Sequence, residues 1–145
     1  MYFKKIAFAV IFLSAAAFSL AQTKTTVKSP NKNIELNFWL NDKGAPMYSV
    51  SFKSREVLLP SAMGFELKQT MSNEALPALK DNLVVTSSTQ TSSNTKWKPV
   101  WGDVKEISDN YSQLKVSLSQ KGDKAISFNI IFKVFDDGVG FRYEF

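Results

Sequence analysis

The sequence predicts an all-β protein, and more narrowly an antiparallel β-sandwich. Apolar and polar side chains alternate in several segments, which is the period of a strand with one buried face. Clusters of Gly, Asn and Asp separate these segments at short intervals and indicate turns. No segment after residue 21 keeps a helical period. Many short strands joined by close turns are typical of a sandwich.

The first strands are predicted at 34–40 and 48–52, joined as a hairpin by an Asn-Asp-Lys-Gly turn. In the first strand, alternate apolar residues are expected to share one buried face: Ile34, Leu36, Phe38 and Leu40. Trp39 is expected on the opposite face, because successive side chains of a strand point to opposite sides. Shorter strands are predicted at 56–59 and 64–67.

A second group of strands is predicted at 83–91, 113–119 and 126–134, the last two as a hairpin. The Ser- and Thr-rich stretch 86–95 is expected to be an exposed edge strand that runs into a loop. Residues 71–80 are expected to form one helical turn at most, because a proline interrupts them.

The last strand is predicted at the end of the chain. After an Asp-Asp-Gly turn, aromatic residues at alternate positions share one face: Phe141, Tyr143 and Phe145. A strand that ends on an unpaired aromatic side chain needs neighbouring strands. We therefore expect the sandwich to be incomplete at this end and the chain to be the front piece of a longer protein.

Composition excludes several kinds of site. The chain has no cysteine and no histidine, which rules out a disulfide scaffold and removes the usual general base and the commonest metal ligand. The formal net charge of +5 is scattered, and no basic run interleaves with aromatic residues, so the sequence gives little support to nucleic-acid binding. No phosphate-binding loop is present.

Residues 1–21 are predicted to be a secretory signal peptide. Two lysines form a positive n-region, residues 6–18 form an apolar h-region, and a small-x-small cleavage site ends at Ala21. The apolar region is too short to span a membrane comfortably. We expect an exported, periplasmic protein that begins at Gln22 and has no membrane segment after cleavage.

The stretch 97–107 holds the main candidate site residues, because two tryptophans lie four residues apart with a proline between them. This pattern does not suit a central strand. Three interpretations of Trp97 and Trp101 stay open: they cap the core, dock a following domain, or stack on sugar rings. Glu106 and Arg142 are the other candidates for contact with a carbohydrate or a domain.

No catalytic or metal-binding residue is predicted. Glycoside hydrolysis needs two carboxylates that flank one bond, and nothing in the sequence brings any two of the candidate glutamates together: Glu35, Glu56, Glu66 and Glu106. The Asp-Asp-Gly sequence at 136–138 is interpreted as a plain turn, because a calcium loop needs more oxygen ligands.

Several motifs point to a known family. The more specific are Trp-Lys-Pro-Val-Trp-Gly at 97–102 and Asp-Asp-Gly-Val-Gly-Phe-Arg-Tyr-Glu-Phe at 136–145. Others are Ser-Pro-Asn-Lys-Asn-Ile-Glu-Leu at 29–36 and Leu-Pro-Ser-Ala-Met-Gly-Phe-Glu-Leu at 59–67. In this order and spacing they resemble the amino-terminal domain of glycoside hydrolase family 97, over nearly all of the chain that follows the leader.

The resemblance implies a mutarotase-like β-super-sandwich, of which residues 22–145 are a part. In that family of periplasmic α-glucosidases and α-galactosidases, the domain precedes a (β/α)8 barrel that holds the catalytic acids. The resemblance implies no cofactor in this chain and a calcium ion in the full-length parent. It implies the missing barrel as a partner, and an α-linked oligosaccharide as a further one.

These observations together predict a non-catalytic amino-terminal domain of an exported α-glycosidase. Such a domain supports the barrel and carbohydrate binding, and we expect no activity from this chain alone. Two alternatives stay open, a free-standing carbohydrate-binding module and a purely structural sandwich.

Export with cleavage after Ala21 is the first testable prediction. The charged, apolar and small-residue regions stand in the order that a signal peptidase substrate requires. Mass spectrometry of the periplasmic fraction is expected to find a product that begins at Gln22. A product that still begins at Met1, or that pellets with membranes, would contradict the prediction.

Overall fold

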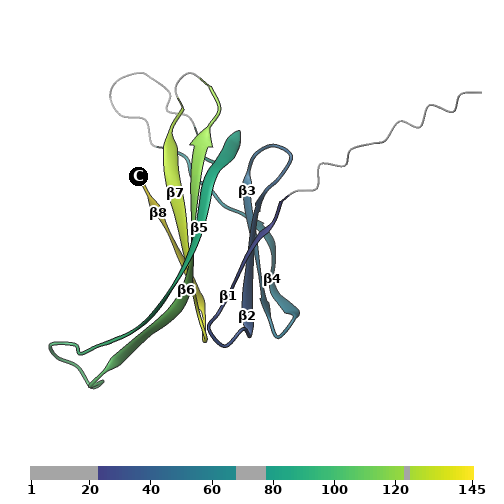
Figure 1. Ribbon diagram of the computed structural model, residues 1–145. Helices are drawn as coiled ribbons and strands as arrows, with labels where there is room; N and C mark the ends of the chain where they lie inside the picture. The colour runs from purple at the N-terminus through teal and green to yellow at the C-terminus, as the bar shows by residue number, and fades with distance from the viewer. Residues whose placement is uncertain (1–22, 68–77, 123–124) are drawn as a thin grey trace, which may run out of the picture.

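The computed structural model describes residues 23–67, 78–122 and 125–145, which form two four-stranded antiparallel sheets (Figure 1). The strands are β1 (Thr25–Lys28), β2 (Ile34–Leu40), β3 (Pro46–Phe52), β4 (Arg55–Ala62), β5 (Leu83–Trp97), β6 (Ile107–Gln120), β7 (Ser127–Phe135) and β8 (Val139–Glu144). The sheets pack as a sandwich, which confirms the predicted fold class. The predicted leader and most of the stretch 71–80 lie outside the described residues. Within the described ranges, no helix has the length and apolarity needed to cross a membrane.

The first sheet has the order β1-β2-β3-β4, so each strand pairs with the next along the chain. The predicted hairpin is the β2–β3 pair, in which Leu36 lies opposite Val50. Asn41 closes its turn, because the side-chain oxygen accepts hydrogen bonds from the backbone N–H groups of Lys43 and Ala45 at 3.0 and 2.9 Å. An Asn side chain that bonds to the backbone two residues on is a common way to form a turn.

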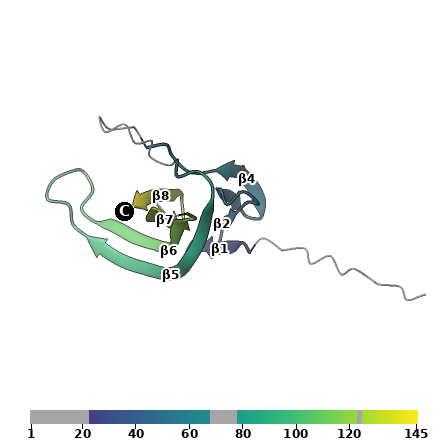
Figure 2. The same ribbon diagram turned by 90° about the horizontal axis from the view of Figure 1, so that it is seen from above.

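The second sheet has the order β5-β6-β7-β8. β5 and β6 form a long ribbon, paired from Leu83 opposite Gln120 to Trp97 opposite Ile107. This β5–β6 ribbon projects beyond the first sheet (Figure 1) and extends away from it in the view from above (Figure 2). β5 is the edge strand of its sheet, as predicted for the Ser- and Thr-rich stretch. It continues to Trp97 before the loop begins.

The core lies between the inner faces of the two sheets. β2 and β7 provide much of it, with these buried side chains: Ile34, Leu36, Phe38, Phe128, Ile130, Phe132 and Val134. The rings of Phe38 and Phe132 are buried, and their centroids lie 5.8 Å apart. Full burial of one such side chain contributes about 2–3 kcal/mol to stability. The alternation that predicted these strands is therefore the alternation that builds the core.

The structure corrects several of the predicted strands. β1 was not predicted, since it has only 4 residues and too few positions to show a period. The strand predicted at 64–67 is wrong, because Phe65 forms only an isolated bridge with Leu79, directly after the positive φ of Gly64. β5 and β6 extend beyond the predicted 83–91 and 113–119. Most of their added residues are polar and show no alternation, so periodicity does not mark them as strand.

Trp39 lies on the face opposite Phe38, as predicted, but it is buried as well, at 7% exposed. Its cross-strand partner is Met47. The Lys24 ammonium lies 4.6 Å from the ring centroid, a favourable placement over an indole face. The outer face of the first sheet therefore has a covered apolar position of its own.

Two glycines allow close approach where the first sheet meets the start of the second. A Cβ at Gly44, whose φ is +71°, would lie 2.7 Å from the backbone N and O of Leu83. A Cβ at Gly64, whose φ is +132°, would lie 2.6 Å from the Cα of Lys80. A side chain at either position would meet backbone atoms at less than 3 Å, so both positions require glycine.

Gly64→Ala is expected to lower the free energy of unfolding by at least about 2 kcal/mol, because the new methyl group meets backbone and the φ is unfavourable. Gly140→Ala is the matched control. A Cβ at Gly140 meets nothing within 4 Å, so its effect should stay within about 0.5 kcal/mol. Urea denaturation of both variants measures the difference, and equal stabilities would contradict the close contact at residue 64.

Candidate functional site

The β5–β6 ribbon ends in a group of exposed apolar side chains, which we call the ribbon tip: Trp97, Val100, Trp101 and Val104. Val100 is 100% exposed and Trp101 is 88% exposed, and the other two are more than half exposed. Single exposed apolar residues are common, but several between residues 97 and 104 make this loop a candidate interaction surface. The two indoles therefore do not cap the sandwich core, and the docking and sugar-stacking interpretations of these residues remain.

Strand pairing and an ion pair hold the base of the ribbon tip. Trp97 lies opposite Ile107 at the last paired position of the ribbon. Beside it, Lys96 Nζ lies 2.8 Å from Glu106 Oε1, so the predicted site residue Glu106 fastens the two sides of the loop. Farther out, Gly102 has a φ of +129° and nothing within 4 Å of an added Cβ. The loop around Gly102 is thus exposed to solvent, whereas regular strand pairing holds its base.

Arg142, the fourth predicted site residue, lies apart from the other three. It is on β8 opposite Ile131, in the body of the second sheet rather than at the ribbon tip (Figure 1). Its Nη2 lies 3.6 Å from Glu144 Oε1. Lys115 also pairs with Glu144 at 2.9 Å, and this hydrogen bond lowers the pKa of the Glu144 carboxyl. Arg142 therefore belongs to an exposed charged cluster.

A second site is an open groove of about 650 Å³ between β1 and the β5–β6 ribbon, which we call the β1–β5 groove. Polar side chains line it on both sides: Lys28, Lys32, Gln90, Thr91, Ser92 and Ser112. The two lysines belong to the first sheet and its β1–β2 turn, and the other four residues to the ribbon. Both sheets therefore contribute hydrogen-bonding groups to the same groove.

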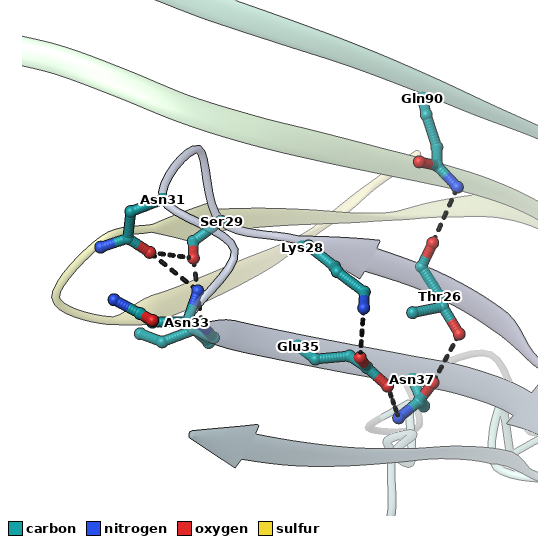
Figure 3. Close-up of polar contacts among 9 residues, drawn as sticks. Thr26, Lys28, Ser29, Asn31, Asn33, Glu35, Asn37 and Gln90 are labelled. Carbon is teal, nitrogen blue, oxygen red and sulfur yellow. Dashed lines mark hydrogen bonds and ion pairs between the residues drawn. The ribbon is translucent and has the colours of Figure 1, made fainter. Parts of the chain in front are cut away.

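A chain of polar contacts joins the two walls of the β1–β5 groove (Figure 3). Gln90 Nε2 donates to the Thr26 carbonyl at 2.9 Å, and Thr26 Oγ1 donates to Asn37 Oδ1 at 2.6 Å. Asn37 Nδ2 donates to Glu35 Oε1 at 3.3 Å, and Lys28 Nζ lies 3.0 Å from Glu35 Oε2. The hydrogen bond from Lys28 lowers the pKa of the Glu35 carboxyl. Gln90 thus bridges the two sheets directly.

The turn between β1 and β2 is fixed by its own side chains (Figure 3). Ser29 Oγ donates to Asn31 Oδ1 at 2.8 Å and accepts from the Ile34 N–H at 3.0 Å. Asn31 Oδ1 also accepts from the Asn33 N–H at 2.9 Å. The Asn31 N–H donates to Asp136 Oδ1 at 2.8 Å, which ties this turn to the β7–β8 turn. One end of the groove is therefore built on a rigid loop.

The described carboxylates do not gather into a metal site. Among the residues that the structure describes, no three Asp or Glu side chains lie close enough to hold a metal ion. Several of these carboxylates pair with lysines instead. Lys80 pairs with Glu66, for example, and this hydrogen bond lowers the pKa of the Glu66 carboxyl.

Sequence reasoning missed the β1–β5 groove because its walls come from distant parts of the chain. The sequence signal that could have indicated the groove is the polarity of ribbon positions that face the first sheet. Leu114 points into the core, yet Ser112, two residues earlier on the same face, is polar. Its cross-strand neighbour Ser92 is polar too. A polar end on an otherwise apolar strand face indicates a position at which the interior is open to water.

Comparison with known proteins places these features in context. The family model described as Glycosyl-hydrolase 97 N-terminal matches residues 27–145. A glycoside hydrolase family 97 enzyme from Pseudoalteromonas sp. strain K8, in complex with acarbose, is 34% identical with a TM-score of 0.71. A variant of the Pseudoalteromonas enzyme in complex with panose gives the same values.

The match covers 82% of this chain but only 17% of the Pseudoalteromonas enzyme. This chain thus spans about a sixth of the length of that relative. A β-arabinopyranosidase structure, 24% identical with a TM-score of 0.68, covers 82% of this chain and supports the fold alone.

Tryptophan fluorescence tests the exposure of the ribbon tip. Trp101→Phe is expected to lower the acrylamide quenching constant of the protein, because it removes the most exposed of the three tryptophans. Trp39→Phe is the control and is expected to raise the constant, because it removes a buried indole. The opposite order of the two variants would contradict the placement of Trp101 in solvent.

Proposed function

This chain belongs to the glycoside hydrolase family 97 amino-terminal domain family, and on that premise we propose that it is the non-catalytic amino-terminal domain of an exported α-glycosidase. Its role is to dock on the catalytic part of the parent polypeptide through the ribbon tip. The expected parent acts on an α-linked oligosaccharide and holds a calcium ion. The predicted leader supports export to the periplasm.

The observation that supports docking most strongly is the exposure of the ribbon tip. Two tryptophans and two valines stand at the end of a ribbon that projects from the sandwich (Figure 1). Tryptophan is enriched among the residues that dominate binding energy at protein interfaces. Burial of an indole contributes about 2–3 kcal/mol that the tip does not obtain within its own fold.

The length of the relatives favours the same polypeptide as the occupant of this surface. The matched part is 17% of the Pseudoalteromonas enzyme, so most of such an enzyme lies outside the domain. A surface of the same chain needs no separate encounter, because a short linker gives it a high effective concentration. An apolar tip on a covalently attached domain is therefore well suited to permanent docking.

A second candidate function is a free-standing carbohydrate-binding module. The same exposed indole of Trp101 supports it, since flat aromatic faces stack on sugar rings. One feature favours docking over stacking. The tip also contains Val100 and Val104, which are not stacking platforms. The reading frame directly downstream of codon 145 provides a cheap test, because the docking proposal expects it to encode the rest of a hydrolase.

Docking is tested by mixing this domain with the separately produced remainder of its parent. The double variant Trp97→Ala/Trp101→Ala is expected to weaken the association at least about tenfold, as loss of two interface anchors should. Val57→Ala/Leu59→Ala, two exposed apolar residues of β4, is the control and should leave it unchanged. Equal weakening by both variants, or no association of the wild type, would contradict docking through the tip.

Catalysis is tested on the purified chain alone. We expect no hydrolysis of p-nitrophenyl α-glucoside or α-galactoside, with or without added calcium, because the catalytic carboxylates belong to the remainder of the parent. Turnover above a blank would contradict the non-catalytic role. Tight binding of maltotriose that Trp101→Ala abolishes would instead support the free-standing module.

A further inference from the structure

The β1–β5 groove has the size and position of a small-molecule site. Its volume of about 650 Å³ lies within the range of about 300–1,000 Å³ that is usual for ligand pockets. Both sheets line it, so a ligand would bridge β1 and the ribbon. We propose that this groove binds an acidic oligosaccharide, that is, a chain of sugar rings bearing carboxylates. This inference is independent of docking through the ribbon tip.

The groove offers donors that have no partner of their own. The side chains of Lys32, Ser92 and Ser112 line it, and none of the three takes part in a hydrogen bond or ion pair within the described part of the chain. No acidic side chain lines the groove. Lys28 pairs with Glu35, yet an ammonium group has three donors. The site therefore presents hydroxyl groups and the positive charge of Lys32, which has no carboxylate partner among the described residues, beside the Lys28 ammonium that Glu35 already pairs.

Lys32 is held in place by a rigid and unfavourable backbone. Its φ is 61°, a region that residues other than Gly, Asn and Asp seldom adopt. The Lys32 N–H donates to the Ser29 carbonyl at 2.8 Å, and the side-chain contacts of Ser29 and Asn31 fix the rest of the turn (Figure 3). A lysine at this φ makes the fold less stable than an asparagine would. A residue that is present despite such a cost is a candidate for function, and here the functional group would be the Lys32 ammonium.

The ribbon wall of the groove is polar at positions that should be apolar. Gln90, Ser92 and Ser112 share a face with the buried Leu114. Inward positions of a sandwich strand normally extend the core. Here they place two hydroxyl groups and the free oxygen of the Gln90 amide along one wall. Hydroxyls and amides in a row match the repeated hydroxyl groups of an oligosaccharide better than a single inorganic anion.

Isothermal titration calorimetry on the purified protein with trigalacturonate tests the proposal, with maltotriose as the uncharged counterpart. Trigalacturonate is expected to bind and maltotriose to bind at least about tenfold more weakly. Added salt should weaken the binding, because the Debye length falls from about 30 Å at 0.01 M to about 10 Å at 0.1 M. Equal affinity for both sugars, or no binding of either, would overturn the proposal.

Lys32→Asn is the sharpest variant, since it removes the charge while Asn tolerates the backbone angle. It should weaken trigalacturonate binding about tenfold and leave the melting temperature unchanged or higher. Lys43→Asn, in the turn at the other end of β2, is the control and should bind like the wild type. Equal weakening by both variants indicates general charge attraction and would overturn the site. Sulfate that binds as tightly as trigalacturonate would overturn the proposal that the ligand of the groove is a saccharide.

Discussion

The contact between the inner faces of the two sheets is the interaction on which the rest of the structure depends. Phe132 on β7 and Phe38 on β2 are buried at its centre, and alternate residues of both strands extend it. A shift of one residue in either register would turn the core-facing apolar side chains of that strand outward. The regular alternation in the sequence therefore selects one register, and this register places every other feature, including the ribbon and the groove.

Both candidate sites lie where the second sheet leaves this contact. Within the core, β6 presents Leu114, Val116 and Leu118 to the first sheet. From Ser112 back toward the start of β6, the same face is polar, and the sheets part to form the β1–β5 groove. Nearer the tip, the ribbon has no second layer, and cross-strand pairing and the Lys96–Glu106 ion pair support it. Binding surfaces are thus built from the part of the sheet that the core does not use.

The sequence was sufficient to predict the strands that contribute an apolar face to the core. It was insufficient to predict the strand segments that lie outside the core. The strands at 34–40 and 126–134 were predictable because each has one apolar face. β5 is polar at every position from 92 to 96, so its length follows from pairing with β6, which sequence periodicity does not indicate. The strand pattern of Arg142 gives no information on its distance from Trp97, and the sheet topology separates the two residues. The groove joins Lys32 to Ser112 across two sheets, a juxtaposition that spacing in the chain does not encode.

Native-state hydrogen exchange tests most directly the claim that one intersheet contact supports the fold while the ribbon stands outside it. The account predicts that amides of 114–118 and 128–134 exchange slowest, with protection set by global unfolding. Amides of 94–97 and 107–110, the part of the ribbon where β5 and β6 pair only with each other, should exchange at least about a hundredfold faster through local opening. Protection in the ribbon equal to that of the core would contradict the account, because it would require a packing layer that the sandwich does not provide.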